Sequence, residues 1–213
     1  MDKKPFTKKE IENITYSGKI YNPMDDRITS VQFKTIALVN KYNKTKNTRS
    51  GFKKRNKLLT KMCGCVGDAC YLEPPVHANF GFSHVYFGNN VYANFNFTCV
   101  DDGKITIGDN TLIGPNVTLV TASHPISPSL RKSGIQYNKE VNIGKNVWLG
   151  AGVIVFPGVT IGDNSIIGAG SIVTHDIKAN VLAYGTPCKE VREITKEDEI
   201  YYDHNKLIKE NGI

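Results

Sequence analysis

The sequence predicts a mainly β protein in which short strands wind into a parallel β-helix. Three observations support this class. An aliphatic residue returns at every sixth position, glycine usually follows it, and the phase holds without a break between residues 143 and 173. A period of six gives one short strand and one turn per unit, and three units make a triangular coil of about 18 residues. An ordinary sheet would instead show a period of two and irregular turn spacing.

The repeated aliphatic position defines the interior of the predicted prism. Because coils stack with equivalent positions aligned, we expect these side chains to meet those of the coils above and below. Glycine beside them permits close backbone approach, and the "GDN" and "GKN" corners supply residues that tolerate left-handed backbone. The interior positions are Ile107, Ile113, Ile143, Leu149, Val155, Ile161, Ile167 and Val173.

The pattern is interrupted twice. It disappears between Val120 and Val141, although Ile113 and Ile143 are still a whole number of six-residue units apart. We therefore predict an excursion loop over residues 121–140, and loops of this length are usually functional. The 20 residues between Phe87 and Ile107 are not a multiple of six, which indicates an insertion near "VDDGK".

Helical segments are expected at both ends of the β-helix. We assign residues 1–72 to an N-terminal helical cap, because Thr7 and Glu10 have the spacing of a capping box and apolar residues follow at helical intervals. Two prolines then stop any helix, and the β-helix is assigned to residues 73–190. Residues 191–213 are charged with apolar residues at helical spacing, which predicts a short C-terminal helix.

The charge of the chain is unevenly distributed. The net charge is +7, and residues 1–61 hold 16 Lys and Arg against 5 Asp and Glu, so this segment carries +11 and the remainder 7 − 11 = −4. A basic segment suits nucleic acid, an anionic cofactor or a solvated helical face, but no nucleic-acid-binding motif accompanies the scattered lysines. We therefore predict no nucleic-acid partner.

We also predict no membrane partner and a cytoplasmic location. No apolar run approaches the roughly 20 residues needed to cross a bilayer, and the first residues lack the apolar segment of a secretory signal. An odd number of cysteines favours reduced thiols, and the "CGCVGDAC" spacing fits no usual four-ligand zinc site, so no metal is expected. The cysteines are Cys63, Cys65, Cys70, Cys99 and Cys188.

A candidate general base stands where the excursion loop begins. His124 precedes Pro125 at this point, and the ordinary pKa range of imidazole suits a base near neutral pH. Asparagine and aspartate residues occur on neighbouring repeats, but no serine or cysteine nucleophile motif is visible. A base without a nucleophile fits direct transfer to a substrate hydroxyl rather than a covalent enzyme intermediate.

Three stretches carry a resemblance to a known family: "VYANFNFTCVDDGKITIGDNTLIGPNVTLVTASHP", "VWLGAGVIVFPGVTIGDNSIIGAGSIVTHDI" and "YGTPCKEVREI". Over residues 85–195 the chain resembles the galactoside and maltose O-acetyltransferases of the hexapeptide-repeat acyltransferase superfamily, and the N-terminal cap resembles them more weakly. The resemblance implies left-handed coils, acetyl-CoA as donor, and a homotrimer with three active sites at subunit boundaries.

The resemblance also implies roles for individual residues. His124 matches the base that takes a proton from a sugar hydroxyl, and Asn94 matches a residue that stabilises the transition state. Asp102 and, less directly, Asn79 match acceptor-binding positions. The positions implied for coenzyme A are Trp148 in the cleft, Ala151, Ala169, Thr174 and His175 along the pantetheine arm, and Lys189 and Arg192 near the phosphates.

The chain departs from the family pattern in the segment that helps to hold the acceptor. Pro23 and Gln32 occupy the places of an aspartate and an arginine, although Asp25, Asp26 and Arg27 lie close by. A non-sugar acceptor, a nucleotidyl or acyl-carrier variant of the fold, and a non-catalytic interaction solenoid therefore remain alternatives. A zinc hydratase would need three converging histidines, and His124 has no close histidine partner in the repeats.

Overall fold

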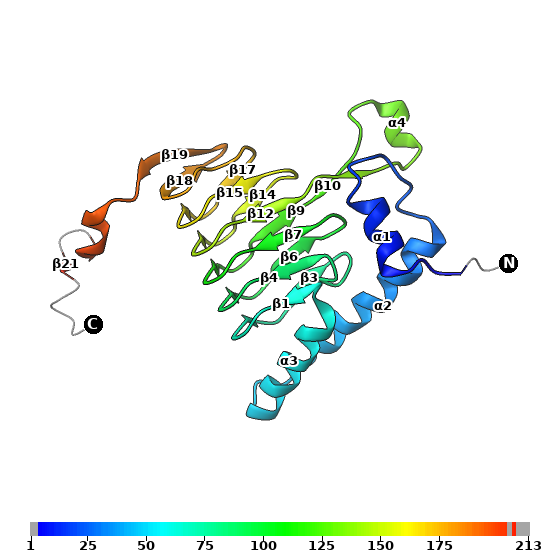
Figure 1. The fold of residues 1–213 in the computed structure, drawn as a ribbon, viewed down its shortest axis with the longest axis horizontal. Helices are drawn as coiled ribbons and strands as arrows, with labels where there is room; N and C mark the ends of the chain where they lie inside the picture. The colour runs from blue at the N-terminus through cyan, green and yellow to red at the C-terminus, as the bar shows by residue number, and fades with distance from the viewer. Residues whose placement is uncertain (1–3, 204–205, 208–213) are drawn as a thin grey trace.

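The computed structural model describes residues 4–203 and 206–207. Three helices come first, α1 (Lys8–Thr15), α2 (Asp26–Asn43) and α3 (Arg49–Met62). Coils of β-structure then stack along the long axis of the molecule, with the helices at one end and the C-terminal tail at the other (Figure 1). None of the helices in these described ranges has the length and apolar character needed to cross a bilayer.

Each coil contributes one strand to each of three parallel sheets, which are the sides of a prism. The first sheet contains β1 (Cys65–Val66), β4 (Val85–Phe87), β7 (Ile105–Ile107), β12 (Val141–Ile143) and β15 (Thr160–Ile161). The second contains β2 (Tyr71–Leu72), β5 (Tyr92–Ala93), β8 (Leu112–Ile113), β13 (Trp148–Leu149), β16 (Ile166–Ile167) and β18 (Val181–Gly185), with β19 (Cys188–Glu193) antiparallel at its end. The third contains β3 (Val76–Ala78), β6 (Phe97–Val100), β9 (Thr118–Val120), β14 (Ile154–Val155) and β17 (Ile172–Val173).

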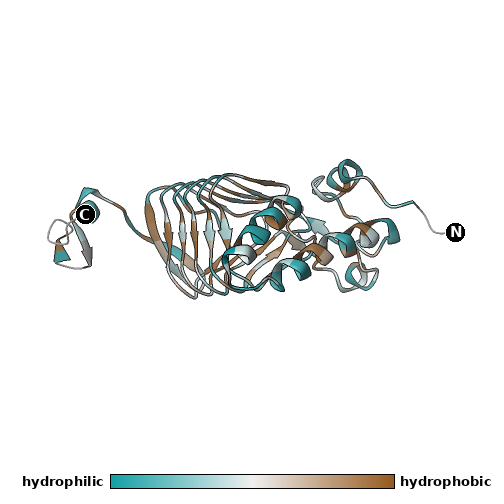
Figure 2. Ribbon diagram, turned by 90° about the horizontal axis from the view of Figure 1, so that it is seen from below, coloured by the Kyte–Doolittle hydropathy of each residue, from teal (hydrophilic) through white to brown (hydrophobic). Residues whose placement is uncertain are grey.

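The predicted interior positions form the core. Ile143 pairs in register with Ile107 on one side and Ile161 on the other, and Leu149 pairs with Ile113 and Ile167 in the next sheet. All eight predicted interior residues are at most 2% exposed. Figure 2 shows these coils side by side, with hydrophobic strands recurring from coil to coil. The parallel β-helix and its register are therefore confirmed.

Asparagines at one corner explain why successive coils repeat so regularly. Asn110, Asn146, Asn164 and Asn180 all have positive φ, between 52° and 61°, a region that asparagine tolerates better than most residues. Their amides also form a ladder, in which Asn146 donates to Asn164 at 3.1 Å and Asn164 to Asn180 at 2.9 Å. The corner residues thus set both the turn and the stacking.

The excursion leaves the third sheet after β9 and returns to the first sheet at β12. It consists of the antiparallel strands β10 (Ala122–Ser123) and β11 (Tyr137–Asn138), joined through the short helix α4 (Pro128–Lys132). Figure 1 shows it projecting from the coils on the side of α1. A β-bridge between Tyr21 and Gln136 fastens its base to the segment that follows α1.

The structure differs from the prediction at both ends of the β-helix. The coils begin at Cys65, inside the segment assigned to the cap. After β19 the described residues hold only a 3-10 turn, η1 (Lys196–Glu199), and the antiparallel strands β20 (Tyr201–Asp203) and β21 (Lys206–Leu207), in place of the predicted helix. Ile200 and Tyr201 are 48% and 42% exposed, so a helix there would lack the packing that stabilises short helices. Residues 204–205 and 208–213 of the predicted helix lie outside the described range.

Candidate active site

Eight of the predicted site residues lie on two different edges of the prism. Asn94, Ala151 and Ala169 follow strands of the second sheet, at the corner where the chain turns toward the third. We call this corner the Asn94 edge. Residues after the strands of the third sheet form the next corner, which we call the His124 edge; it carries Asn79, Asp102, His124, Thr174 and His175. Strand β6 separates the two edges within a coil and spans roughly 10 Å, so Asn94 and His124 of one chain do not contact each other.

The excursion fixes the orientation of His124. Its Nδ1 lies 2.8 Å from the carbonyl oxygen of Ile135, on the returning arm of the loop. A carbonyl can only accept, so Nδ1 carries the proton and donates it, and the lone pair of the neutral ring is on Nε2. The ring itself is exposed. His124 therefore presents a basic nitrogen to solvent in a fixed tautomer.

Asp102 lies in a turn one coil below His124 and is only 4% exposed. Each of its two carboxylate oxygens accepts a hydrogen bond from a different side chain. Asn79 Nδ2 donates to Oδ2 at 2.9 Å, and Gln136 Nε2 donates to Oδ1 at 3.0 Å. The structure thus brings together Asn79 and Asp102, the two residues predicted to bind the acceptor, and adds an amide from the excursion loop.

The same amide connects the excursion loop to the N-terminal segment. Gln136 Nε2 lies 2.8 Å from the Tyr21 hydroxyl and 3.1 Å from Asn138 Oδ1. Asn138 Nδ2 in turn donates to the Thr15 carbonyl at 2.9 Å and to the Tyr21 hydroxyl at 3.0 Å. Burial, largest among the causes, raises the pKa of Tyr21 to about 12, so this hydroxyl is protonated at neutral pH.

A second buried carboxyl stands next to Asp102. Asp101 is fully buried, its Oδ1 accepts a hydrogen bond from the Phe80 backbone N–H at 2.7 Å, and its Oδ2 has no hydrogen-bond partner among the described residues. Burial raises the pKa of this carboxyl to about 7, against an ordinary value of 3.8. His84, whose pKa burial lowers, bonds the Asp101 carbonyl through Nδ1 at 2.8 Å.

The outer face of the second sheet carries an apolar column. Tyr92, Leu112 and Trp148 are aligned by the strand register and are 38%, 50% and 52% exposed. The corner beside this column is formed by backbone and small side chains, with Gly170 N–H donating to the Ala151 carbonyl at 2.8 Å. Ala151 and Ala169 are themselves exposed.

The remaining predicted cofactor residues lie toward the C-terminal end of the β-helix. Thr174 Oγ1 and His175 Nδ1 lie 2.9 Å apart. Lys189 is exposed on β19, whereas Arg192 forms a two-pronged ion pair with Asp198, at 2.8 and 2.7 Å.

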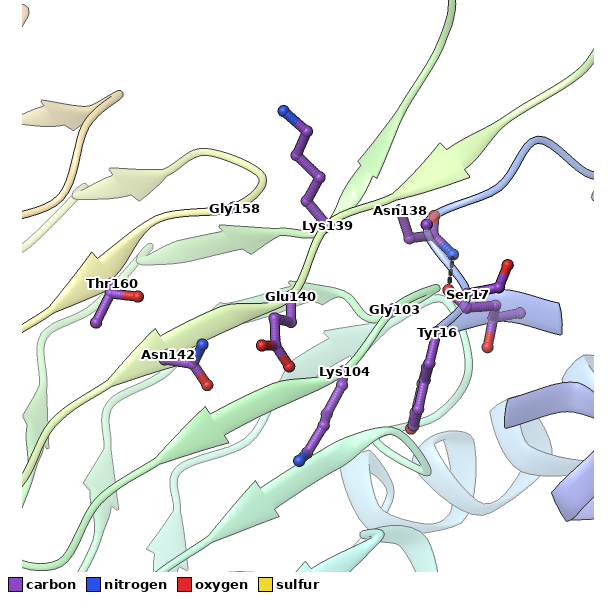
Figure 3. A pocket seen from close by; sticks show the side chains of 12 residues that line it. Tyr16, Ser17, Gly103, Lys104, Asn138, Lys139, Glu140, Asn142, Gly158 and Thr160 are labelled. Carbon is purple, nitrogen blue, oxygen red and sulfur yellow. Dashed lines mark hydrogen bonds between the residues drawn. The ribbon is translucent and has the colours of Figure 1, made fainter. Parts of the chain in front are cut away.

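A cavity of about 420 Å³ is bounded by α1, the base of the excursion and the first sheet (Figure 3). The cavity is lined by Asn142 and Thr160 of the first sheet and by Lys104 and Glu140, which directly precede strands of that sheet. Tyr16, at the end of α1, also lines it. Asn138 connects this cavity to the Asp102 network. None of the predicted catalytic residues lines it.

The charged residues suggested as substitutes for the missing acceptor contacts are engaged locally. Asp25 caps α2 and pairs with Arg27, whose Nε donates to Oδ1 at 2.8 Å, and the guanidinium lies 4.2 Å from the Phe6 ring centroid. Asp26 is exposed at the first position of α2.

The described residues include no cluster of three or more histidine, cysteine, aspartate or glutamate side chains arranged to hold a metal ion. Their cysteines are all free thiols. Tyr21, Gln136 and Asn138 are the site residues that sequence reasoning missed. They lie where the six-residue pattern is absent, so periodicity gives no signal for them.

A β-helix of six-residue repeats and an oriented histidine at the start of an excursion point to a hexapeptide-repeat acyltransferase. A family profile described as the hexapeptide repeat of succinyl-transferase matches residues 104–126 and 140–175. The galactoside O-acetyltransferase of Lactococcus lactis is 49% identical over 91% of this chain and 92% of its own length. The chain therefore belongs to the galactoside O-acetyltransferase family of hexapeptide-repeat acyltransferases.

Solved structures agree with this assignment. A galactoside acetyltransferase in complex with coenzyme A superposes with a TM-score of 0.87 at 42% identity, covering 95% of this chain and 98% of that one. A maltose O-acetyltransferase from Clostridium difficile 630 superposes with a TM-score of 0.83 at 40% identity, covering 89% and 98%.

Proposed function

We propose that this chain transfers the acetyl group of acetyl-CoA to a hydroxyl of a sugar or related acceptor, with His124 as general base. The observation that carries the proposal is the bond from His124 Nδ1 to the Ile135 carbonyl, which leaves Nε2 as an oriented base. The coenzyme A bound in the galactoside acetyltransferase supports the choice of donor.

The chemistry needs no covalent enzyme intermediate. Nε2 of His124 takes the proton from the acceptor hydroxyl as its oxygen attacks the thioester carbonyl carbon. The C–S bond of the tetrahedral intermediate then breaks, and the imidazolium returns the proton to the departing thiolate, which gives free coenzyme A and the acetyl ester. Asp102 accepts hydrogen bonds from acceptor hydroxyls, and Asn79 holds one of its oxygens in place.

We propose a homotrimer, and the separation of the two edges supports a site shared between chains. Asn94 can donate to the oxyanion only if its edge is supplied by a neighbouring chain, which would place each active site at a boundary between subunits. The exposed apolar column of Tyr92, Leu112 and Trp148 lies beside the Asn94 edge, and an exposed aromatic and aliphatic patch is typical of an association surface. A preorganised hydrogen-bond donor to the oxyanion, the role proposed for Asn94, contributes a factor of about 10²–10³ in rate.

Coenzyme A is proposed to follow the same boundary. Ala151 and Ala169 would offer backbone groups to the pantetheine arm, with Trp148, Thr174 and His175 flanking it. Lys189 and Arg192 would meet the phosphates, since cations bind phosphate through charge-assisted hydrogen bonds. We propose a cytoplasmic location, which suits the free thiols of the described residues.

The test is a His124→Ala variant assayed with acetyl-CoA and a panel of glucosides, galactosides and maltose, following release of free thiol. Removing a general base should lower kcat by a factor of about 10²–10⁴. The oligomeric state, measured by analytical ultracentrifugation, and the Kd for coenzyme A should not change. Full activity in the variant would show that His124 is not the base.

The panel also separates the alternatives. Coenzyme A binding with thiol release only on non-sugar hydroxyl or amine acceptors would favour an acyltransferase of different acceptor class. If wild-type protein binds no coenzyme A, the chain is a non-catalytic interaction solenoid.

A further inference from the structure

Gln136 stands at the centre of a buried polar network, and the catalytic scheme above gives Gln136 itself no role. It is 6% exposed, and its Nε2 lies within 3.1 Å of three oxygens, on Tyr21, Asp102 and Asn138. Nε2 has only two protons for these three acceptors. The Asp102 carboxylate is an obligate acceptor when ionised and the strongest of the three, so one proton is directed to it.

The three elements that meet at Gln136 are distant in sequence. Tyr21 follows α1, Asp102 ends the coil that contains β6, and Gln136 precedes β11 in the excursion. A backbone bridge between Tyr21 and Gln136, with N–H···O distances of 2.8 and 3.0 Å in the two directions, fixes the glutamine backbone. The side chain is therefore aimed at Asp102 by main-chain contacts that do not involve a substrate.

The buried Asp102 carboxylate depends on hydrogen-bond donors such as the Gln136 amide. Asp102 is 4% exposed, and its described hydrogen-bond donors are the Asn79 and Gln136 amides. A carboxylate taken out of water needs hydrogen bonds to each oxygen, or its orientation and its charge are both lost. Pro23 and Gln32 stand where the resemblance implies an aspartate and an arginine. The second described donor to Asp102 comes from the excursion loop.

We propose that Gln136 is a positioning residue that aims the Asp102 carboxylate at the acceptor and thereby couples the N-terminal segment and the excursion loop to acceptor binding. This inference rests on the proposed function, because it takes Asp102 to be the acceptor-binding carboxylate. Tyr21 and Asn138 hold Gln136 in turn. The hydroxyl-bearing acceptor is then recognised by a carboxylate whose direction is set by amides and not by an arginine.

The first test is Gln136→Leu, which removes the donor at similar size. Losing one hydrogen bond to a charged group should raise the KM for the acceptor by about 10- to 100-fold. The KM for acetyl-CoA should stay unchanged, and kcat should change much less than the acceptor KM. Lys132→Ala, an exposed position on α4 of the same excursion, is the matched control and should behave as wild type.

The second test, Gln136→Glu, distinguishes positioning from a general loss of structure. When protonated, the introduced carboxyl can still donate to Asp102; when ionised, it repels Asp102. The ratio of its acceptor KM to that of wild type should therefore be near one at low pH and rise as pH rises. The titratable groups in contact with position 136 are Asp102 itself and Tyr21, whose hydroxyl is protonated over this range. Lys104, Lys139 and Glu140 line the adjacent cavity, and Asp101 turns toward Phe80.

The possible results distinguish failure of the positioning role from failure of the proposed function. An acceptor KM for Gln136→Leu equal to wild type, or a flat KM ratio across pH for Gln136→Glu, overturns the positioning role. Equal increases in the KM values of acceptor and acetyl-CoA also overturn it, since they indicate a distorted loop. Absence of acetyl transfer by the wild-type protein refutes the proposed function instead.

Discussion

The buried carboxyl of Asp101 predicts a distinctive dependence of stability on pH. Asp101 is fully buried, and one of its oxygens lacks a hydrogen-bond partner in the described part of the chain. Its pKa is about 7 in the folded protein, whereas the ordinary value is 3.8. The folded state therefore holds a proton that the unfolded state has already lost between these values. Stability from this group is fully present below the unfolded pKa and is lost as pH rises through the folded one.

The size of the effect follows from the two pKa values. They differ by about three pH units, and at 1.36 kcal/mol per unit the loss between about pH 4 and pH 7 is on the order of 4 kcal/mol. Asp101→Asn removes the titration while keeping an oxygen for the Phe80 N–H. The amide and the protonated acid differ in stability by an amount that does not vary with pH.

The assay compares urea unfolding of wild type and Asp101→Asn at one protein concentration, since oligomerisation makes stability depend on concentration. We expect the stability of the variant relative to wild type to increase by up to about 4 kcal/mol between about pH 4 and about pH 8. Other titrating groups cancel in this difference. A difference that stays constant across the range would show that Asp101 is ionised in the folded protein, and the reasoning would be wrong.

Two further predictions concern the β-helix. Leu149→Ala should lower the free energy of unfolding by about 2–5 kcal/mol, because the side chain is fully buried between Ile113 and Ile167 and its removal leaves a cavity. Thermal unfolding measures this, and a free energy of unfolding within about 1 kcal/mol of the wild-type value would argue against a tightly filled prism. Asn164 has a φ of 61°, so Asn164→Ala should be less stable than Asn164→Gly by about 1 kcal/mol, the reverse of the usual order. Chemical unfolding of both variants checks this, and an alanine variant as stable as the glycine one would contradict it.

Much of the fold could be predicted because its determinants are local and repeated. Each interior residue from Ile143 to Val173 contacts its own equivalent in the next coil, so the spacing along the chain is also the spacing in space. The tail could not be predicted in this way. Its apolar residues have helical spacing, but Ile200 and Tyr201 have no core to pack against, and periodicity alone does not report whether a packing partner exists.

The candidate site likewise has a part that the sequence could predict and a part that it could not. His124 could be singled out because it stands where a regular pattern stops. Asn79 and Asp102 were selected from the resemblance, and the structure shows them hydrogen-bonded to each other. The contacts of Tyr21, Gln136 and Asn138 join segments more than 100 residues apart. No sequence pattern predicts contacts between segments so far apart in the chain.

The sequence by itself determined the prism, its register and the position of the excursion, because a six-residue repeat constrains every coil through its neighbours. Only the tertiary structure decided the tautomer of His124, the burial of Asp101 and Asp102, and the placement of Asn94 on a different edge from His124. These depend on where the chain goes after the repeat is broken, and the physical reason is that hydrogen bonds and burial are set by contacts between distant segments rather than by local spacing.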